Sequence, residues 1–305
     1  MDGPAARSST SGPATGPPGG RMLAGVVATF DWLEARWESP RAHRLVSGLL
    51  VGGFLVALAA VELSRLGLLG GLGARVPHNH FRAIEIAFYL LLSYEVVGLV
   101  FGIASSISKA AGKQLEIFSL ILLRHAFEVF GRLGEPVVWE ELRRLVPEML
   151  SDAAGALAIF VVLAFYYRAC RHQPAPGDPA DRRSFIAAKK LVALLLLAAF
   201  AALGARALWS QMGLHGDLHG FFEGFYTLLI FADILVVLMS MRYSSSYPVV
   251  FRNSGLTVAT VLLRVGLSAP PFFNAALGLA AALFALALTL AYNRHAAVPP
   301  PAPAA

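Results

Sequence analysis

The sequence predicts an all-α polytopic membrane protein, a bundle of about eight transmembrane helices arranged as two parallel four-helix repeats. Three observations predict this fold class. The chain of 305 residues is 57% hydrophobic and only 14% charged, whereas soluble domains carry roughly a quarter charged residues. The apolar residues gather in runs of about 20 residues, the length that crosses a hydrocarbon core. In addition, one pattern of charged residues occurs twice along the chain.

The repeated pattern consists of two acids in one apolar segment and an arginine in the next. The two copies are formed by Glu85, Glu95 and Arg124, and by Glu223, Asp233 and Arg264. The two acids are ten residues apart in both copies, and both copies end in Leu-Leu-Arg. We therefore predict that the chain contains two copies of one membrane unit, each built on a buried acid–arginine pair.

Residues 1–44 are predicted to form a disordered tail and an interfacial helix. The tail at 1–20 is rich in Gly, Pro, Ser, Thr and Ala, a composition that buries too little apolar surface to fold. From Met22 to Glu38, apolar residues recur at three- and four-residue spacing with charged residues between them. This periodicity predicts an amphipathic helix that lies in the membrane interface and ends at Ser39-Pro40.

The first membrane unit is expected at residues 45–169. Its crossings are predicted at 45–65, 83–104, 113–131 and 153–167. The segment 113–131 has a short apolar core and several ionisable residues, so its composition also allows a re-entrant hairpin or an interfacial helix. Between it and the last crossing, residues 132–150 are predicted to form a polar amphipathic insertion.

The second membrane unit is expected at residues 191–293, after a basic cytoplasmic loop at 170–190 that is rich in Pro and Arg. Its crossings are predicted at 221–241 and at three further segments, 191–209, 255–268 and 272–292. Residues 294–305, which contain mostly Ala and Pro after Asn293, are predicted to form a disordered tail.

The distribution of Lys and Arg favours eight crossings with both termini in the cytoplasm. With this topology most loop Lys and Arg face the cytoplasm, as the positive-inside tendency requires. If 113–131 did not cross, the basic residues of 168–190 would lie outside. The net charge of +6 then reflects membrane topology, and we expect no nucleic-acid partner.

The acids and arginines within the membrane should pair, because an ionisable group near the bilayer centre costs roughly 2.5–3.5 kcal/mol. At 1.5 Å per residue, Glu95 and Arg124 lie about 13 Å and about 16 Å from the inner ends of their helices. Asp233 and Arg264 lie at similar depths. We predict the pairs Glu95–Arg124 and Asp233–Arg264, with Glu85 and Glu223 as secondary acids. Either the pairs are fixed salt bridges that set helix register, or they open to form an ion or proton path.

Several histidines and one aspartate near the outer ends of the crossings form a candidate metal site. They are His78, His80, His215, Asp217 and His219. Histidine and carboxylate groups bind Zn²⁺ and other divalent metals, but the histidine spacing differs between the two halves. The alternative is a set of solvated or interfacial histidines, sensitive to pH.

The sequence shows no motif of a nucleotide-binding, nucleophilic or cysteine-based metal site. The chain lacks nucleotide-binding loops, nucleophile elbows and cysteine pairs for metals, so we expect neither enzymatic activity nor a cofactor. Cys170 is the only cysteine, which excludes an intramolecular disulfide. The expected partners are the lipid bilayer, anionic lipid at the basic loop 168–190, and a second copy of the chain in a homo-oligomer.

The C-terminal half resembles the phosphate-starvation-inducible PsiE family. The residues that carry the resemblance are Glu223, Asp233, Tyr243, Pro248, Gly255, Thr257, Arg264, Pro270, Thr289, Leu290 and Asn293. Members are small bacterial inner-membrane proteins with four crossings, so the resemblance implies a bacterial plasma membrane location and a fold, and no established biochemical activity. The N-terminal half matches only through Glu85, Glu95 and Arg124. It lacks an equivalent of Pro248, and Asp233 stands where the family has Glu.

Two functions remain open from the sequence. The first is ion or proton transport, or a channel-like activity, through the intramembrane acid–arginine pairs. The second is a non-transporting membrane protein of the stress response, in which the pairs are structural. In that case the segments 132–150 and 168–190 would be surfaces for a partner protein.

Overall fold

The computed structural model describes residues 18–68, 79–134, 136–170, 179–212, 218–243 and 246–296. These residues form helices joined by short connections, and none of them forms a strand. After α1 (Pro18–Trp37) and α2 (Pro40–Arg65), the chain continues through α3 (Arg82–Ile103), α4 (Ile107–Glu128), the 3-10 helix η2 (Val129–Arg132), α5 (Trp139–Ala169), α6 (Pro179–Met212), α7 (Leu218–Tyr243), α8 (Tyr247–Leu267) and α9 (Phe273–Ala296).

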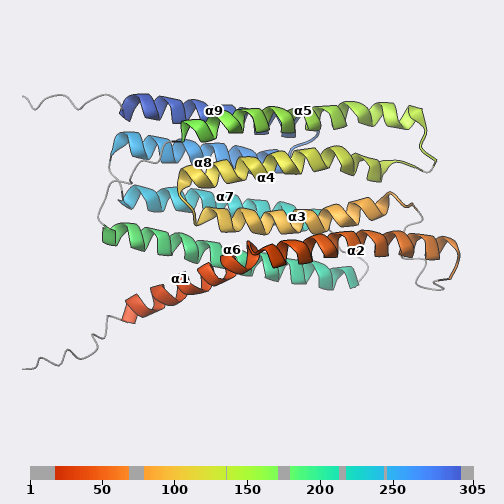
Figure 1. The fold of residues 1–305 in the computed structure, drawn as a ribbon, viewed down its shortest axis with the longest axis horizontal. Helices are drawn as coiled ribbons and strands as arrows, with labels where there is room; N and C mark the ends of the chain where they lie inside the picture. The colour runs from red at the N-terminus through yellow and green to blue at the C-terminus, as the bar shows by residue number, and fades with distance from the viewer. Residues whose placement is uncertain are drawn as a thin grey trace, which may run out of the picture.

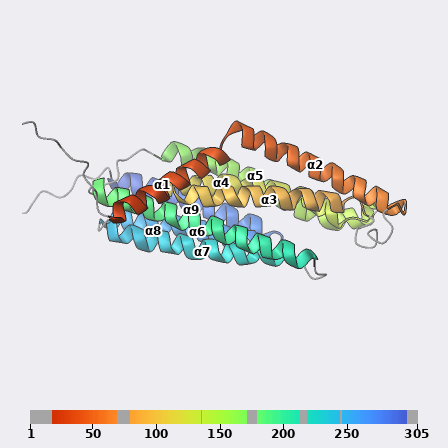
Figure 2. The same ribbon diagram turned by 90° about the horizontal axis from the view of Figure 1, so that it is seen from below.

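The helices α2 to α9 lie roughly along the long axis of the molecule in two layers. The first layer contains α2 to α5 and the second contains α6 to α9, and the helices follow the same order in both (Figures 1 and 2). Between the layers, α4 packs against α8 and α5 packs against α9. The two halves of the chain therefore share one core.

Five of the described helices, α2, α5, α6, α7 and α9, are long and apolar enough to cross a membrane. The expectation of an all-helical membrane protein is confirmed at this level, whereas the eight crossings stay a prediction. The apolar stretch of α3, Ala87–Ile103, is shorter. The helices α4 and α8 also fall outside this set, and they contain many buried residues, including the fully buried Arg264. The charge of Arg264 is tolerated there because its side chain faces protein.

The predicted insertion at 132–150 is not a separate helix, and this boundary was wrong. Residues from Trp139 onward belong to α5, a single helix of 31 residues that continues through Pro147 into the apolar segment. No helix terminator separates Leu150 from Ala153, because Ser151 and Asp152 stand there. The polar and apolar parts therefore form one continuous helix. Within it, the Asp152 side chain accepts a hydrogen bond from Asn274 of α9.

The predicted basic loop at 170–190 was also too long. The helix α6 begins at Pro179 and already contains the basic positions from Arg182 to Lys190. Proline suits the first position of a helix, because its fixed φ is helical and its missing N–H has no intrahelical acceptor there. The basic charge therefore lies on the first turns of a helix that continues into the apolar segment.

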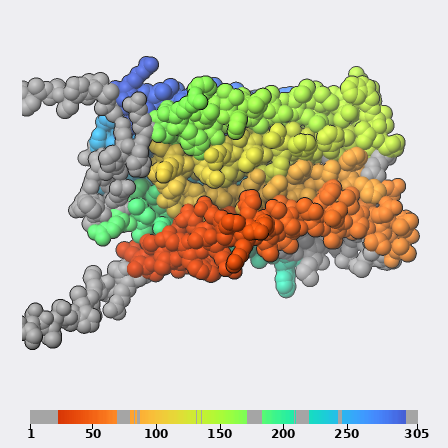
Figure 3. All heavy atoms as spheres, viewed as in Figure 1, coloured from red at the N-terminus to blue at the C-terminus, as the bar shows by residue number. Residues whose placement is uncertain are grey.

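The amphipathic helix α1 packs on the bundle as well as presenting a polar face. Phe30 is fully buried and meets Phe101 of α3 edge to face, with ring centroids 5.6 Å apart. Asp31 pairs with Lys190 of α6. Ser39 caps α2 by accepting a hydrogen bond from the backbone N–H of Ala42. Figure 3 shows α1 and α2 lying one after the other along one face of the molecule.

Small residues allow the closest helix contacts. A Cβ at Gly155 of α5 would lie 2.7 Å from the Cβ of Ala275 in α9, and a Cβ at Gly278 of α9 would overlap the ring of Phe118 in α4. Small residues let membrane helices approach closely, which is where packing in a bilayer gains most. These contacts join α4, α5 and α9 into the centre of the core.

Candidate functional site

The first acid–arginine pair joins α3 and α4. The Arg124 guanidinium contacts the Glu95 carboxylate, and both side chains are about one tenth exposed, at 12% and 11%. The two helices are antiparallel neighbours joined by a short turn, so residues that lie equally far from the turn come side by side. We call this contact the outer pair.

The second pair joins α7 and α8 by the same geometry. The Nε of Arg264 lies 3.5 Å from Oδ2 of Asp233, and the two side chains are 1% and 7% exposed. Gln114 of α4 and Thr260 of α8 also interact with the Asp233 carboxylate. We call this contact the inner pair. Because Gln114 belongs to the first half of the chain, the inner pair is completed across the two layers.

The inner pair retains unused hydrogen-bonding capacity. Among the residues that the structure describes, neither Nη2 of Arg264 nor Oε1 of Gln114 has a hydrogen-bond partner. Buried polar atoms are normally paired, and an unpaired one costs roughly 1–3 kcal/mol. The surroundings of Asp233 therefore keep a donor and an acceptor that are not satisfied.

Tyr226 of α7 connects the surroundings of the two pairs. Its phenol interacts electrostatically with both Arg124 and Arg264, and the residue is only 6% exposed. One turn earlier, the ring of Phe222 lies 6.3 Å from the Tyr226 ring, centroid to centroid. Tyr226 is thus close enough to both arginines to link the two pairs electrostatically into one polar cluster.

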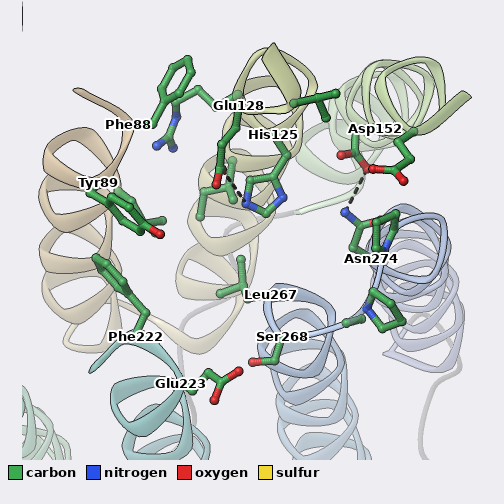
Figure 4. Close-up of a pocket in the computed structure, with 18 of the residues that line it drawn as sticks. Phe88, Tyr89, His125, Glu128, Asp152, Phe222, Glu223, Leu267, Ser268 and Asn274 are labelled. Carbon is green, nitrogen blue, oxygen red and sulfur yellow. Dashed lines mark hydrogen bonds and ion pairs between the residues drawn. The ribbon is translucent and has the colours of Figure 1, made fainter. Parts of the chain in front are cut away.

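A cavity of about 370 Å³ reaches this cluster from the end of the bundle where α4 ends and α7 begins. We call it the vestibule (Figure 4). It is lined by side chains of α3, α4, α5, α7 and the α8–α9 connection. Its charged lining residues are Arg124, Glu128, Arg132, Glu148, Asp152 and Glu223. Of the four residues in the two pairs, only Arg124 lines it.

The vestibule exists because the second layer is shorter at this end. After α8 ends at Leu267, the residues Ser268–Pro271 reverse the chain, and Phe272 adopts a left-handed conformation with φ of 72°. The helix α9 then begins, at 24 residues against 31 for its neighbour α5. Figure 1 shows α5 extending beyond α9 at this end. The reversal therefore forms part of the vestibule wall.

Polar contacts hold the vestibule wall in place. The Nδ2 of Asn274 donates to Oδ1 of Asp152 at 2.9 Å, and Nη1 of Arg132 donates to Oε2 of Glu148 at 3.1 Å. His125 lies with Nε2 3.7 Å from Oε2 of Glu128. Figure 4 shows Glu223 on the opposite side of the vestibule, beside Ser268. Four carboxylates against two guanidinium groups give the vestibule an excess of negative charge.

The candidate metal site receives no support from the residues described. His78, His215 and Asp217 lie outside the described residues, and for His219, as for Glu85, only the helical backbone is described. The ring of His80 contacts Glu62 at 2.9 Å and Arg65 at 3.1 Å. Within the described residues, no group of three His, Cys, Asp or Glu side chains is placed to hold a metal ion.

Sequence reasoning found both pairs but missed the groups around them. Gln114, Asp152, Tyr226 and Asn274 are single polar residues in helices, and each contacts an element distant in sequence. A polar residue within an apolar segment is itself a signal of an interior position. Its partner, however, depends on which helices pack together.

Comparisons of the chain with protein-family models, with curated proteins and with solved structures gave no match.

Proposed function

We propose that this chain is a membrane transport protein in which protons or small cations pass along the two acid–arginine pairs. The observation that carries the proposal is the continuity of the polar cluster. The outer pair, Tyr226 and the inner pair are neighbours, and Arg124 and Tyr226 also line the vestibule. The proposal includes eight crossings in two parallel four-helix repeats.

The chemistry follows from the charges. An excess of carboxylates at the mouth of a path raises the local concentration of cations, including protons. A proton that reaches the Glu95 carboxylate from the vestibule neutralises it, and Arg124 then loses its ionic partner. Because an unpaired buried charge is costly, the arginine must find a new position or a new partner. Loading of the acid with a proton is thereby linked to movement of the arginine.

A non-transporting membrane protein is the second candidate. The deep burial of the inner pair, with Arg264 only 1% exposed, favours a fixed salt bridge that sets the register of α7 and α8. The resemblance to the PsiE family supports a role in a stress response of the bacterial inner membrane. Under either proposal, the N- and C-termini are cytoplasmic, the basic start of α6 binds anionic lipid, and the chain forms homo-oligomers.

Reconstitution into liposomes that contain a pH-sensitive dye separates the two candidates. Under an imposed pH gradient and membrane potential, we expect dye-reported proton flux from the native protein and its loss in Asp233→Asn. Ser240→Ala is the matched control, because Ser240 is a buried polar residue of the same helix and its hydroxyl donates to the backbone carbonyl of Val237 within that helix. Absence of proton or cation flux from correctly folded native protein would refute the transport proposal and leave the structural one.

A further inference from the structure

We infer that the two acid–arginine pairs are successive sites of a single path and that Tyr226 is the gate between them. This inference rests on the proposed transport function and states how the path is divided. A duplicated unit would most simply provide two equivalent paths side by side, one for each pair. The contacts around the pairs contradict that equivalence.

The two pairs differ in their access to the vestibule. Arg124 of the outer pair lines the vestibule, whereas neither Asp233 nor Arg264 of the inner pair does. The exposure of the side chains follows the same order, from 12% for Arg124 to 1% for Arg264. An ion or proton entering from the vestibule therefore meets the outer pair first.

Tyr226 occupies the position between the vestibule and the inner pair. It lines the vestibule, yet it also interacts with the guanidinium of Arg264, which does not. The aromatic ring is large, almost fully buried and held beside Phe222. A ring in this position excludes water from the inner pair until it rotates away. The nearby guanidinium groups favour the closed position, since they attract the partial negative charge of the phenol oxygen.

On the far side of the gate, polar side chains surround the acid of the inner pair. Gln114 and Thr260 surround the Asp233 carboxylate, and Gln114 belongs to α4, the helix that also provides Arg124 of the outer pair. One helix thus contributes to both sites. This sharing is expected of consecutive steps along one path, and two independent units would not need it.

Single neutralising variants distinguish one path from two. In liposomes, we expect Glu95→Gln and Asp233→Asn each to abolish the flux carried by the native protein, because a single path is stopped at either site. Two parallel paths would instead leave about half of the flux in each single variant and none in the double variant. That second outcome would overturn the inference while leaving transport itself established.

Cysteine accessibility tests the gate without any transport measurement. In a Cys170→Ala background, which removes the only native cysteine, Thr260→Cys places a thiol beside the inner pair and Ser268→Cys places one in the vestibule. A charged, water-soluble thiol reagent should label Ser268→Cys rapidly and leave Thr260→Cys unlabelled. Adding Tyr226→Ala should expose Thr260→Cys to the reagent, whereas Tyr226→Phe, which keeps the ring, should not.

Labelling of Thr260→Cys behind the native Tyr226, or its continued protection behind Tyr226→Ala, would overturn the assignment of the gate. Elution of each variant as a single peak on size-exclusion chromatography in detergent checks that it keeps its fold, and an unchanged rate at Ser268→Cys shows that reagent access to the vestibule is the same in all of them. If the native protein carries no flux but the labelling follows the expected pattern, the transport proposal fails and the barrier at Tyr226 stands.

Discussion

Asp233 and Arg264 can lie at the centre of the bundle because each is a partner of opposite charge for the other. The gain from pairing buried charges is largely cancelled by the cost of removing them from water, so a buried pair contributes little to stability as a whole. Loss of one partner is different, because it leaves a buried charge without compensation.

We predict that Asp233→Asn lowers the free energy of unfolding by about 3–5 kcal/mol. The expected loss for Glu95→Gln is smaller, because Arg124 reaches the vestibule and can be hydrated there. Unfolding by denaturant in mixed micelles measures both values. The double variant Asp233→Asn with Arg264→Gln should recover part of the loss. A double variant less stable than Asp233→Asn alone would contradict the pairing.

Glu34 makes the docking of α1 depend on pH. Burial raises the pKa of its carboxyl group above the ordinary value of 4.5, as do Glu38 and Asp31, while Lys190 opposes them. The ionised form is therefore disfavoured when α1 is docked. Docking should strengthen as the pH falls from neutral through the raised pKa, and this gain is complete near 4.5, where the undocked carboxyl also becomes protonated.

The fluorescence of Trp37, which stacks on Tyr94 with ring centroids 4.7 Å apart, reports the docking of α1. Because other tryptophans contribute, the signal is taken as the difference from a Trp37→Phe variant. Glu34→Gln should remove the pH dependence in this range and hold α1 docked at neutral pH. An unchanged pH profile in Glu34→Gln would show that another group controls the docking.

At the scale of helices, tight packing decides which segments form the centre of the molecule. Gly278 of α9 and Gly155 of α5 leave no room for a side chain, so α4, α5 and α9 approach one another closely. The composition of α4 made its place uncertain, whereas its burial among α3, α5 and α8 explains how its ionisable residues are accommodated. The apolar core and the distribution of Lys and Arg indicated a crossing there, and the neighbours of α4 determine its environment.

We predict that Gly278→Ala destabilises the protein by about 1–3 kcal/mol, since the new methyl group would overlap the ring of Phe118 and force the core apart. Gly224→Ala in α7 is the matched control, because no atom lies within 4 Å of the added Cβ. Thermal unfolding of both purified variants in the same detergent gives the comparison. Equal melting temperatures would show that α4 and α9 are less closely packed than the structure indicates.

At the scale of the whole molecule, an even number of crossings places both termini on one side of the membrane. Because α4 and α8 fall outside the set of helices that are apolar enough to cross by composition, the topology needs a direct test. The direction of α6 is diagnostic: it ends outside if α4 crosses and inside if α4 does not.

We predict that alkaline phosphatase fused after Met212 is active in bacteria and that the same reporter fused after Ala305 is inactive. A green fluorescent protein fused at the two positions should give the opposite pattern, because it matures only in the cytoplasm. An inactive phosphatase after Met212, with fluorescence from the matching fusion, would mean that 113–131 does not cross.

The sequence by itself determined the membrane class, the repeated charged positions and the acid–arginine pairs. These follow from local rules, since the length of an apolar run, the cost of a buried charge and the antiparallel arrangement of consecutive helices are all set by residues close in the chain. Two boundaries were wrong, at 132–150 and 170–190, because polar helical turns there continue directly into the apolar segments of α5 and α6.

Only the tertiary structure decided how the two halves of the chain pack together. In the structure, Gln114 of the first half contacts Asp233 of the second half, and Tyr226 lies beside both arginines. The vestibule reaches only the outer pair, through Arg124. Two of these relations, Gln114 with Asp233 and Tyr226 with Arg124, join residues that lie more than 100 positions apart in the chain. Hydrophobic periodicity shows which face of a helix is buried but not which distant helix covers it, because that choice depends on how complete side-chain surfaces fit together.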